Sequence, residues 1–487
     1  MIVYAIGLIR LRLLALLGAF AFALAACGGG GGGSGTSPVA PPPATGGLAV
    51  TLTSPAAYAT GIVGALSLSA TATDPAGIAK LEFQVDGQPA GAPLTAAPYT
   101  TSIDTTAFAS GQHVVRVRAT NANGVVSDWS STTVLFGGSR AVPAGFTRND
   151  GWLAGLDSAT AFTQAPDGRF FIAEQGGNLR VVKNGVLLPT PFVQLAVNPA
   201  GERGLIGVAL HPGFASNGWI YLYYTTDIGG THNRISRFTA AGDVASAGSE
   251  VVLVDLPALG ATNHNGGAMH FGSDGKLYVG VGENAVAARA QDPASPFGKL
   301  LRFNDDGTIP ADNPFQATRS GLARAIWASG LRNPYTFAIQ PGTGLMYIND
   351  VGNATWEEID VGLAGANYGW PSSEGPDGVA AGITAPIFSY KHSAARPPGS
   401  GPGGFFTGES IIGGAFYPEA GNFPAAYRGS YFFADYTSQF VARLDSANGN
   451  AAYSFATLTD LPVGLLVGLD GALYLLTRSG VTRISAP

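Results

Sequence analysis

A strand–turn–strand unit recurs six times in the C-terminal two thirds of the chain, and this repetition restricts the fold more than any other feature. Each unit has an apolar strand, a tight turn that often contains Asp-Gly, a second strand rich in Tyr, Phe and Val, and a third strand. The copies are APDGRFFIAEQGGNLRVV from residue 165, HPGFASNGWIYLYYT from 211, GSDGKLYVGVGE from 272, QPGTGLMYINDVG from 340, YRGSYFFADYTSQFVARL from 427 and GLDGALYLLTRSGVTRI from 468. Six such copies predict a six-bladed β-propeller over residues 140–487.

Residues 48–137 contain short alternating strands separated by Gly, Pro, Asn and Asp, which predicts a small antiparallel β-sandwich. The strands LEFQVDG and VVRVRATNANG resemble those of bacterial immunoglobulin-like modules. The whole chain has 70 glycines, 32 prolines and only 12% charged residues, which also favours turn-rich all-β folds. We expect this module to be a spacer or a carbohydrate-facing adhesive domain.

The N-terminus has the pattern of an export signal over residues 1–26, with two arginines before an apolar run that is short for a membrane span. Leu-Ala-Ala-Cys resembles the bacterial lipobox, so we expect Cys27, the only cysteine, to be lipidated. The alternative is an ordinary signal peptide. Residues 27–47 are rich in Gly and Pro and predict a tether. The expected location is therefore the bacterial cell envelope, periplasmic or at the surface, with a lipid anchor in the membrane.

The formal net charge of −6 is spread along the chain without blocks of one sign. A nucleic-acid-binding protein usually carries a basic stripe or patch, and none is visible in the sequence. We therefore expect no nucleic-acid partner.

Three ionisable residues occupy the same place in three consecutive repeats. Glu202, His264 and Arg332 each precede the first strand of a unit. In a propeller these positions converge on the central channel, where ligands commonly bind, so the three side chains are expected to point into one cavity. Gly266 and Gly267, which follow His264 and Asn265, also indicate that something approaches the backbone closely there.

Several longer stretches resemble one enzyme family. They are GERGLIGVALHPGF (201–214), NHNGGAMHFGSDGKLYVGVGEN (263–284), GKLLRFNDDGTIPADNPF (298–315), IWASGLRNPYTFAIQPGTGLMYINDVGNATWEEID (326–360), GANYGWPSSEG (365–375) and IIGGAFYP (411–418). These motifs resemble the soluble aldose dehydrogenases that depend on pyrroloquinoline quinone (PQQ), also called glucose/sorbosone dehydrogenases. The resemblance implies oxidation of an aldose sugar or related alcohol, with PQQ and calcium as cofactors.

The resemblance also implies roles for individual residues. His264 matches the general base, which takes a proton from the anomeric hydroxyl, and Glu283 stands where the family has an aspartate that orients it. Arg332 matches an arginine that stabilises charge on the reduced quinone, and Asn333 would bond a quinone oxygen. Glu202 stands where some relatives have a sugar-binding glutamine.

Calcium in this family is held partly by two backbone carbonyls, which match Gly352 and Asn353, and Gly352 also adjoins the cofactor. Three acids that follow this loop form either a structural calcium site or a solvated face: Glu357, Glu358 and Asp360.

The chain departs from the family pattern near its C-terminus. Soluble glucose dehydrogenases hold the carboxylates of PQQ there with a lysine and a pair of arginines, as an anionic cofactor requires. This chain has no arginine from 444 to 477, and Lys391 is the only nearby lysine before that stretch.

Two other functions remain open. One is a propeller without cofactor that binds a glycan or a protein partner, and the other is a calcium-dependent lactonase-type hydrolase. Four other histidines of the repeat region lack metal-ligand spacing and are expected to be structural or surface residues: His211, His232, His270 and His392. One aromatic set is expected to pack between strands: Tyr221, Tyr223, Tyr224, Phe432 and Phe433.

Overall fold

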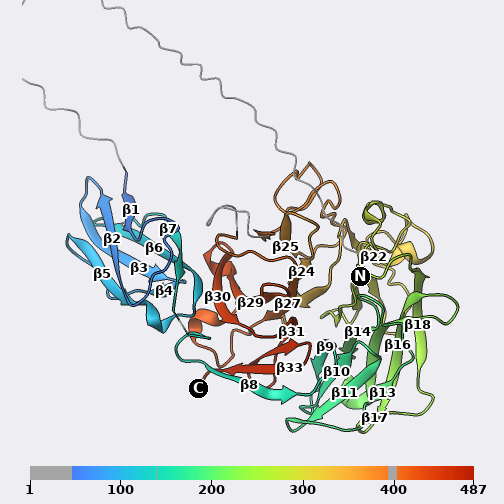
Figure 1. The fold of residues 1–487 in the computed structure, drawn as a ribbon. Coiled ribbons are helices and arrows are strands. Elements are labelled where there is room, and N and C mark those ends of the chain that lie inside the picture. Colours follow the sequence, from blue (N-terminus) through green and yellow to red (C-terminus); the bar gives the residue numbers. More distant parts are fainter. Residues whose placement is uncertain (1–46, 139, 393–402) are drawn as a thin grey trace, which may run out of the picture. The chain divides into compact units, whose positions relative to one another are not determined.

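The computed structural model describes residues 47–138, 140–392 and 403–487 (Figure 1). The predicted signal, Cys27 and most of the tether lie outside the described residues. In the described part nearly all regular structure is β-strand, with one four-residue helix, α1 (Phe214–Asn217), and a few short 3-10 turns. The prediction of an all-β chain is therefore confirmed. No helix among these residues is long and apolar enough to cross a membrane.

The N-terminal region is a sandwich of two antiparallel sheets, as predicted for an immunoglobulin-like module. Its core residues come from both sheets and include Leu68, Phe83 and Val117, because alternate residues of each strand face inward. One sheet has the order β1 (Ala49–Ser54), β2 (Ala65–Thr73) and β5 (Tyr99–Asp104); the other has β4 (Gln88–Pro89), β3 (Ile78–Val85), β6 (Gly111–Asn121) and β7 (Ser130–Phe136).

Six antiparallel sheets follow, which we number one to six in chain order. Sheet one consists of β9 (Ala159–Gln164), β10 (Phe170–Glu174), β11 (Asn178–Lys183), β12 (Val186–Leu187) and β13 (Val193–Gln194). Sheet two consists of β14 (Leu205–Leu210), β15 (Trp219–Thr226), β16 (His232–Ala241), β17 (Val244–Ala245) and β18 (Val251–Ala258). Sheet three consists of β19 (Met269–Phe271), β20 (Leu277–Val281), β21 (Lys299–Phe303) and β22 (Ile326–Ser329).

Sheets four to six each have four strands. Sheet four consists of β23 (Thr336–Ile339), β24 (Met346–Asp350), β25 (Trp356–Val361) and β26 (Phe388–Lys391). Sheet five consists of β27 (Ile411–Phe416), β28 (Tyr431–Asp435), β29 (Phe440–Asp445) and β30 (Ala451–Thr457). Sheet six consists of β31 (Pro462–Val467), β32 (Leu473–Thr477), β33 (Gly480–Ser485) and β8 (Thr147–Ala154). Strand β8 precedes sheet one in the chain, yet it completes sheet six by pairing with β33.

The first strands of successive sheets contact one another. β9 contacts β14, β14 contacts β19, β19 contacts β23, β23 contacts β27, β27 contacts β31, and β31 contacts β9. In each sheet the second strand pairs antiparallel with the first. The start of every first strand therefore lies at the same edge of its sheet as the end of the second strand.

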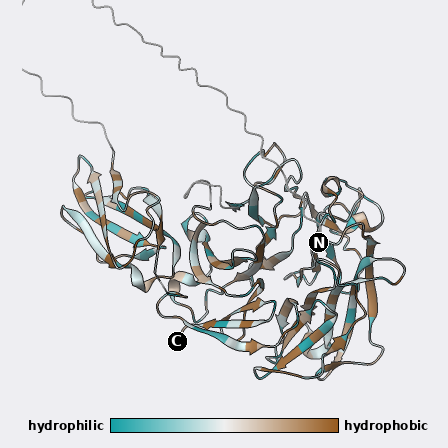
Figure 2. Cartoon of the chain, viewed as in Figure 1, coloured by the Kyte–Doolittle hydropathy of each residue, from teal (hydrophilic) through white to brown (hydrophobic). Residues whose placement is uncertain are grey.

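The hydrophobic core of this region consists of six clusters, and each is shared by two neighbouring sheets. The second strands of five sheets, such as β20 and β32, are buried at every residue, because neighbouring sheets cover both of their faces. Figure 2 shows how hydrophobic residues run along the strands. The aromatic set expected to pack between strands is at most 4% exposed, which confirms that expectation.

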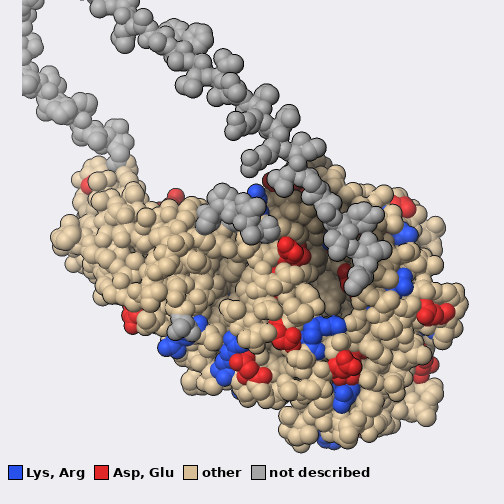
Figure 3. All heavy atoms as spheres, in the orientation of Figure 1, with Lys and Arg blue, Asp and Glu red and all other residues tan. Residues whose placement is uncertain are grey.

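Charged residues of both signs are scattered over the face drawn in Figure 3, among a majority of uncharged residues. No extended patch of one sign is visible on that face.

Candidate active site

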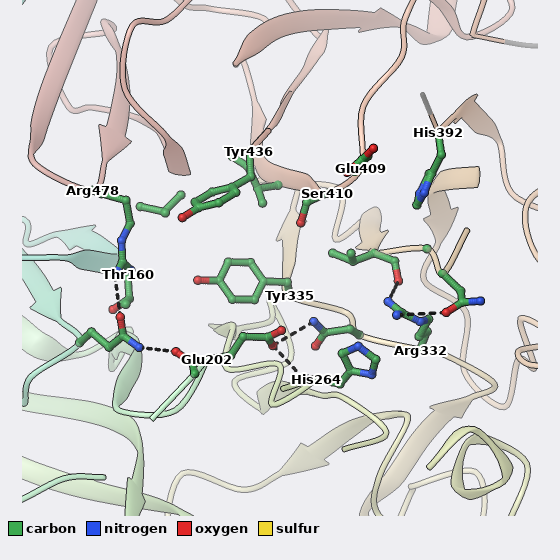
Figure 4. A pocket seen from close by; sticks show the side chains of 18 residues that line it. Thr160, Glu202, His264, Arg332, Tyr335, His392, Glu409, Ser410, Tyr436 and Arg478 are labelled. Atoms are coloured by element: carbon green, nitrogen blue, oxygen red, sulfur yellow. Dashed lines mark hydrogen bonds between the residues drawn. The ribbon is translucent and has the colours of Figure 1, made fainter. Parts of the chain in front are cut away.

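A cavity of about 430 Å³ is lined by residues from all six repeats (Figure 4). Most of them lie directly before a first strand or directly after a second strand, at the sheet edge where these ends meet. The lining includes Thr160, Gln175, Glu202, His264, Arg332, Asn333, Tyr335, Gly352, Asn353, His392, Glu409, Ser410, Tyr436 and Arg478. The structure therefore brings together Glu202, His264 and Arg332, the three residues that the repeat phase places in one cavity.

The His264 side chain is held by a buried carboxylate. Its Nδ1 is hydrogen-bonded to Oε1 of Glu283, which follows β20 and is 2% exposed. An ionised carboxylate only accepts hydrogen bonds, so Nδ1 carries the proton in the neutral ring, which leaves the lone pair on Nε2 free. The other oxygen of Glu283 is buried and has no hydrogen-bond partner among the described residues.

The glycines after His264 are required by close contacts within the chain and by the backbone conformation. His264 has φ 54°, and Gly266 and Gly267 also have positive φ. A Cβ on Gly266 would lie 2.4 Å from the carbonyl oxygen of Gly280, and one on Gly267 would lie 2.8 Å from that of Ile206. The close approach predicted from the sequence is thus made by neighbouring strands of the same chain.

Glu202 connects the His264 loop with the Arg332–Asn333 turn. One carboxylate oxygen, Oε2, accepts a hydrogen bond from the backbone N–H of His264 at 2.8 Å and another from Nδ2 of Asn333 at 3.3 Å. The Asn333 Oδ1 in turn accepts one from the N–H of Gly266 at 3.1 Å. These bonds fix the relative positions of the base and the arginine turn, which come from different repeats.

The Arg332–Asn333 turn is clamped by Asp350, the last residue of β24. Both backbone N–H groups of the turn donate to this carboxylate, at 2.8 and 2.7 Å. Burial raises the pKa of Asp350 to about 7, although the two N–H donors and the charge of Arg332 oppose that shift. Sequence reasoning assigned no role to Asp350.

The Arg332 guanidinium binds the loop after β24. Its Nη1 donates to the carbonyl of Val351 at 3.0 Å, and Nη2 donates to Oδ1 of Asn353 at 3.4 Å. Its Cζ lies 5.6 Å from the ring centroid of Trp370, and its buried Nε has no partner among the described residues. Both terminal nitrogens of the arginine are therefore anchored, and its remaining N–H donors are left for a ligand.

The loop expected to hold a metal presents two carbonyl groups. The backbone N–H of Gly352 donates to Glu357, and that of Asn353 donates to Glu374. Within the described part of the chain, nothing donates a hydrogen bond to the carbonyl of Gly352 or of Asn353. Both residues line the cavity, so their carbonyl oxygens are available to a hard cation such as calcium.

The three acids after this loop are buried, and the interpretation of a solvated face is wrong. Glu357, Glu358 and Asp360 are at most 7% exposed. Glu357 accepts hydrogen bonds from Nε2 of His392 at 2.6 Å and from the N–H of Ile411 at 2.8 Å. The described residues contain no group of three His, Cys, Asp or Glu side chains arranged to hold a metal. They therefore offer no acidic metal cluster of the kind that a lactonase-type hydrolase would need.

Sequence reasoning missed several residues of the cavity. His392 was expected to be structural or superficial, yet its ring lines the wall. Burial opposes its charge, but the hydrogen bond that its Nε2 donates to Glu357 prevails and raises the pKa of His392. Burial also raises the pKa of Tyr335 to about 12, so its hydroxyl stays protonated at neutral pH.

Arg478, directly after β32, is another missed residue. It lies just beyond the arginine-free stretch and brings a second guanidinium to the cavity. Lys391, in contrast, lies over the ring of Trp356, with Nζ 4.9 Å from the ring centroid. It does not line the cavity.

Two known protein families match this chain. The family described as Glucose / Sorbosone dehydrogenase matches residues 156–485, and the family described as Bacterial Ig domain matches residues 49–117. Aldose sugar dehydrogenase YliI of Escherichia coli (strain K12) is 33% identical over 257 residues, which are 49% of this chain and 69% of that protein. Quinoprotein glucose dehydrogenase B of Acinetobacter calcoaceticus is 30% identical over 254 residues, 46% of this chain and 52% of that protein.

A solved structure shows the same fold. The crystal structure of the soluble aldose sugar dehydrogenase from Escherichia coli, in the apo-form, matches with a TM-score of 0.60 and 28% identity. The match covers 70% of this chain and 100% of that one. With a family match across all six sheets, this chain belongs to the glucose/sorbosone dehydrogenase family.

Proposed function

We propose that the protein oxidises an aldose sugar or a related alcohol with PQQ and calcium as cofactors. The observation that carries this proposal is the cavity that His264 and Arg332 line together, with His264 held by Glu283. The names of the two relatives, an aldose sugar dehydrogenase and a quinoprotein glucose dehydrogenase, support the substrate class and the cofactor.

In the proposed reaction His264 is the general base. Its free Nε2 takes the proton of the substrate hydroxyl, while Glu283 stabilises the imidazolium that forms. When bound, PQQ supplies the acceptor for the hydride that leaves the same substrate carbon. Arg332 places a fixed positive charge where negative charge develops. The proton and the hydride together account for the two-electron oxidation.

The residues present fit both cofactors. The N–H donors of Arg332 and the amide of Asn333 suit a flat quinone with anionic groups, and Gly352 lies beside them. The carbonyls of Gly352 and Asn353 would hold calcium, whose remaining ligands would be oxygens of the cofactor and water, since calcium takes six to eight. Glu202 would bind the sugar, because its Oε1 is not used by the His264 and Asn333 bonds.

The architecture around this site is part of the proposal. We infer that the six sheets are the blades of a closed six-bladed propeller over residues 140–487, preceded by the immunoglobulin-like sandwich over 48–137. The ring of first-strand contacts and the pairing of β8 with β33 support closure. We also infer that residues 1–26 are a signal, that Cys27 is lipidated and that the 27–47 tether links the protein to the cell envelope. Incorporation of labelled fatty acid into wild type but not into Cys27→Ser tests the anchor.

Reconstitution tests the function. The purified protein is loaded with PQQ and calcium, and oxidation of a panel of aldoses is recorded with an artificial electron acceptor. We expect turnover that requires both cofactors. A protein that neither binds PQQ nor oxidises any aldose would refute the proposal and leave a binding propeller.

A further inference from the structure

Two guanidinium groups line the cavity without a carboxylate partner. Within the described part of the chain, neither Arg332 nor Arg478 forms an ion pair, whereas Arg302 and Arg483 elsewhere in the sheets are paired with aspartates. Two carboxylates, Glu202 and Glu409, also line the cavity. Neither lies within ion-pair distance of the two arginines, so both positive charges stay available to an anionic ligand.

Arg478 reaches the cavity from the sheet edge of the sixth repeat. In Figure 4 it lies across the drawn pocket from Arg332, and Tyr335 lies between them. A ligand that contacts both guanidiniums must therefore carry negative charge at two separate places. A small anion with a single charged group would not meet that requirement.

The fork of Arg478 is held in place by two acceptors. Its Nη1 donates to the carbonyl of Ala159 at 3.1 Å, and Nη2 donates to Oε1 of Gln175 at 2.5 Å. The Gln175 amide is itself fixed, because Nε2 donates to the carbonyls of Gly201 at 2.7 Å and Arg203 at 2.9 Å. A guanidinium has five N–H donors, so the two bonds leave three for a ligand. Little side-chain entropy is then lost when a ligand binds.

We propose that Arg478 is a cofactor-binding residue that holds a carboxylate of PQQ from the side of the cavity opposite Arg332. This inference rests on the proposed function, because PQQ is the ligand there and carries carboxylates. It also accounts for the absence of arginines from 444 to 477. The positive charge comes instead from Arg478, which follows the second strand of its sheet, β32, much as Glu283 follows the second strand β20. Bidentate binding of a carboxylate is the task for which arginine is suited.

A purely structural role for Arg478 makes a different prediction. Its bonds to Ala159 and Gln175 connect sheet six with sheet one, so its removal could lower the melting temperature without affecting any ligand. Removal of a cofactor-binding residue also lowers the affinity for PQQ, and it does so only when the carboxylates of PQQ are charged.

The test is a titration of the full-length protein, in calcium buffer, with PQQ and with its trimethyl ester, followed by quenching of tryptophan fluorescence. The ester keeps the quinone and loses the three charges. Arg478→Gln should raise the Kd for PQQ by roughly 10- to 100-fold, since a hydrogen bond between charged groups contributes about 1.5–3 kcal/mol. The same variant should leave the Kd for the ester within about twofold, because its bonds to the ester are not charge-assisted.

Two further variants complete the experiment. Arg478→Lys keeps the charge without the fork, and is expected to weaken PQQ binding by an intermediate factor. Arg483→Gln is the matched control, since Arg483 lies on β33 and is paired with Asp470 outside the cavity. It should bind PQQ like wild type.

The outcomes are distinguishable. If wild type binds PQQ and Arg478→Gln binds it equally well, the inference about Arg478 is overturned while the proposed function stands. A wild-type protein that fails to bind PQQ overturns both. Should Arg478→Gln not fold, the ratio of PQQ to ester affinity in Arg478→Lys decides, and a ratio equal to that of wild type rejects the inference.

Discussion

Glu283 holds the ring of His264 through Nδ1, from nineteen residues further along the chain. The histidine lies before the first strand of sheet three and the glutamate after the second, so a single hairpin brings them together. Glu202 fixes the backbone of the same histidine from another repeat. The imidazole is thus oriented from two sides before any substrate binds.

His264→Gln removes the base and keeps a similar side-chain size. If His264 takes the substrate proton, kcat should fall by roughly 100- to 10,000-fold, while the Kd for PQQ changes little. Steady-state rates and a fluorescence titration measure the two quantities. His211→Gln is the control, because His211 bonds Asn217 and lies outside the cavity. A loss of PQQ binding equal to the loss of rate would assign His264 to the cofactor instead.

Glu283→Gln tests the orienting carboxylate without changing its length. The amide can still accept a hydrogen bond from Nδ1, but it no longer stabilises the imidazolium with a negative charge. We expect kcat to fall roughly 10- to 1,000-fold with KM nearly unchanged. Glu283→Asp should recover part of the rate if the shorter side chain still reaches the ring. Equal rates for wild type and Glu283→Gln would show that the charge plays no part.

The repeat pattern predicted much of the fold and of the site, because it reports which positions share a sheet edge. Glu202, His264 and Arg332 were found because each precedes a first strand. The same edge also receives the ends of the second strands, where Gln175, Glu283 and Arg478 lie. The positions after the second strands therefore indicate Arg478 as a cavity residue from the sequence alone.

Other features could not be read from the sequence. Three acids within four residues are hydrophilic by composition, and only the packing of β25 between neighbouring elements shows that they are buried. The clamp that Asp350 forms on the Arg332–Asn333 turn depends on the exact approach of two loops. Hydrogen bonds between residues distant in sequence leave no periodic signal.

Removal of calcium and a change at Gly352 should have related effects. A chelator should abolish turnover, and calcium should restore it, if the Gly352 and Asn353 carbonyls hold the ion. In Gly352→Ala the new Cβ would lie 1.7 Å from the carbonyl oxygen of Trp356, so the loop must shift. We expect half-maximal activation at a calcium concentration at least tenfold higher. Gly151→Ala, whose new Cβ would lie 3.8 Å from Oδ1 of Asn149, should behave like wild type.

Lys299→Met should destabilise the fold without touching the cavity. The Lys299 ammonium is fully buried and donates to the carbonyls of Arg289, Ala290 and Phe297 at 2.7–2.8 Å. Its removal leaves three acceptors without this donor, so we expect a loss of roughly 3 kcal/mol or more in the free energy of unfolding. Urea denaturation measures it. Lys276→Met, which loses one bond to Asn304 nearer the surface, should cost about 1 kcal/mol or less. Similar losses in both variants would contradict the argument.

His270 should make the fold less stable in acid. His270 is exposed on β19 to a narrow channel between the first strands, where no carboxylate is among the described lining residues, and the partial loss of water around the ring in that channel lowers the pKa of His270. Below the ordinary pKa of about 6.5 the unfolded chain takes up a proton that the folded protein does not. The stability contributed by the neutral ring is therefore complete above pH 6.5 and decreases as the pH falls below that value.

His270→Gln removes this titration, so the variant should lose less stability than wild type between pH 7 and pH 4.5. Urea denaturation at both pH values gives the difference for each protein, and the comparison of the two differences cancels the other titrating groups. Thr336→Ser is the control, because it alters the same channel without a titratable group. An equal loss in wild type and His270→Gln would mean that the ring is protonated as readily in the channel as in water.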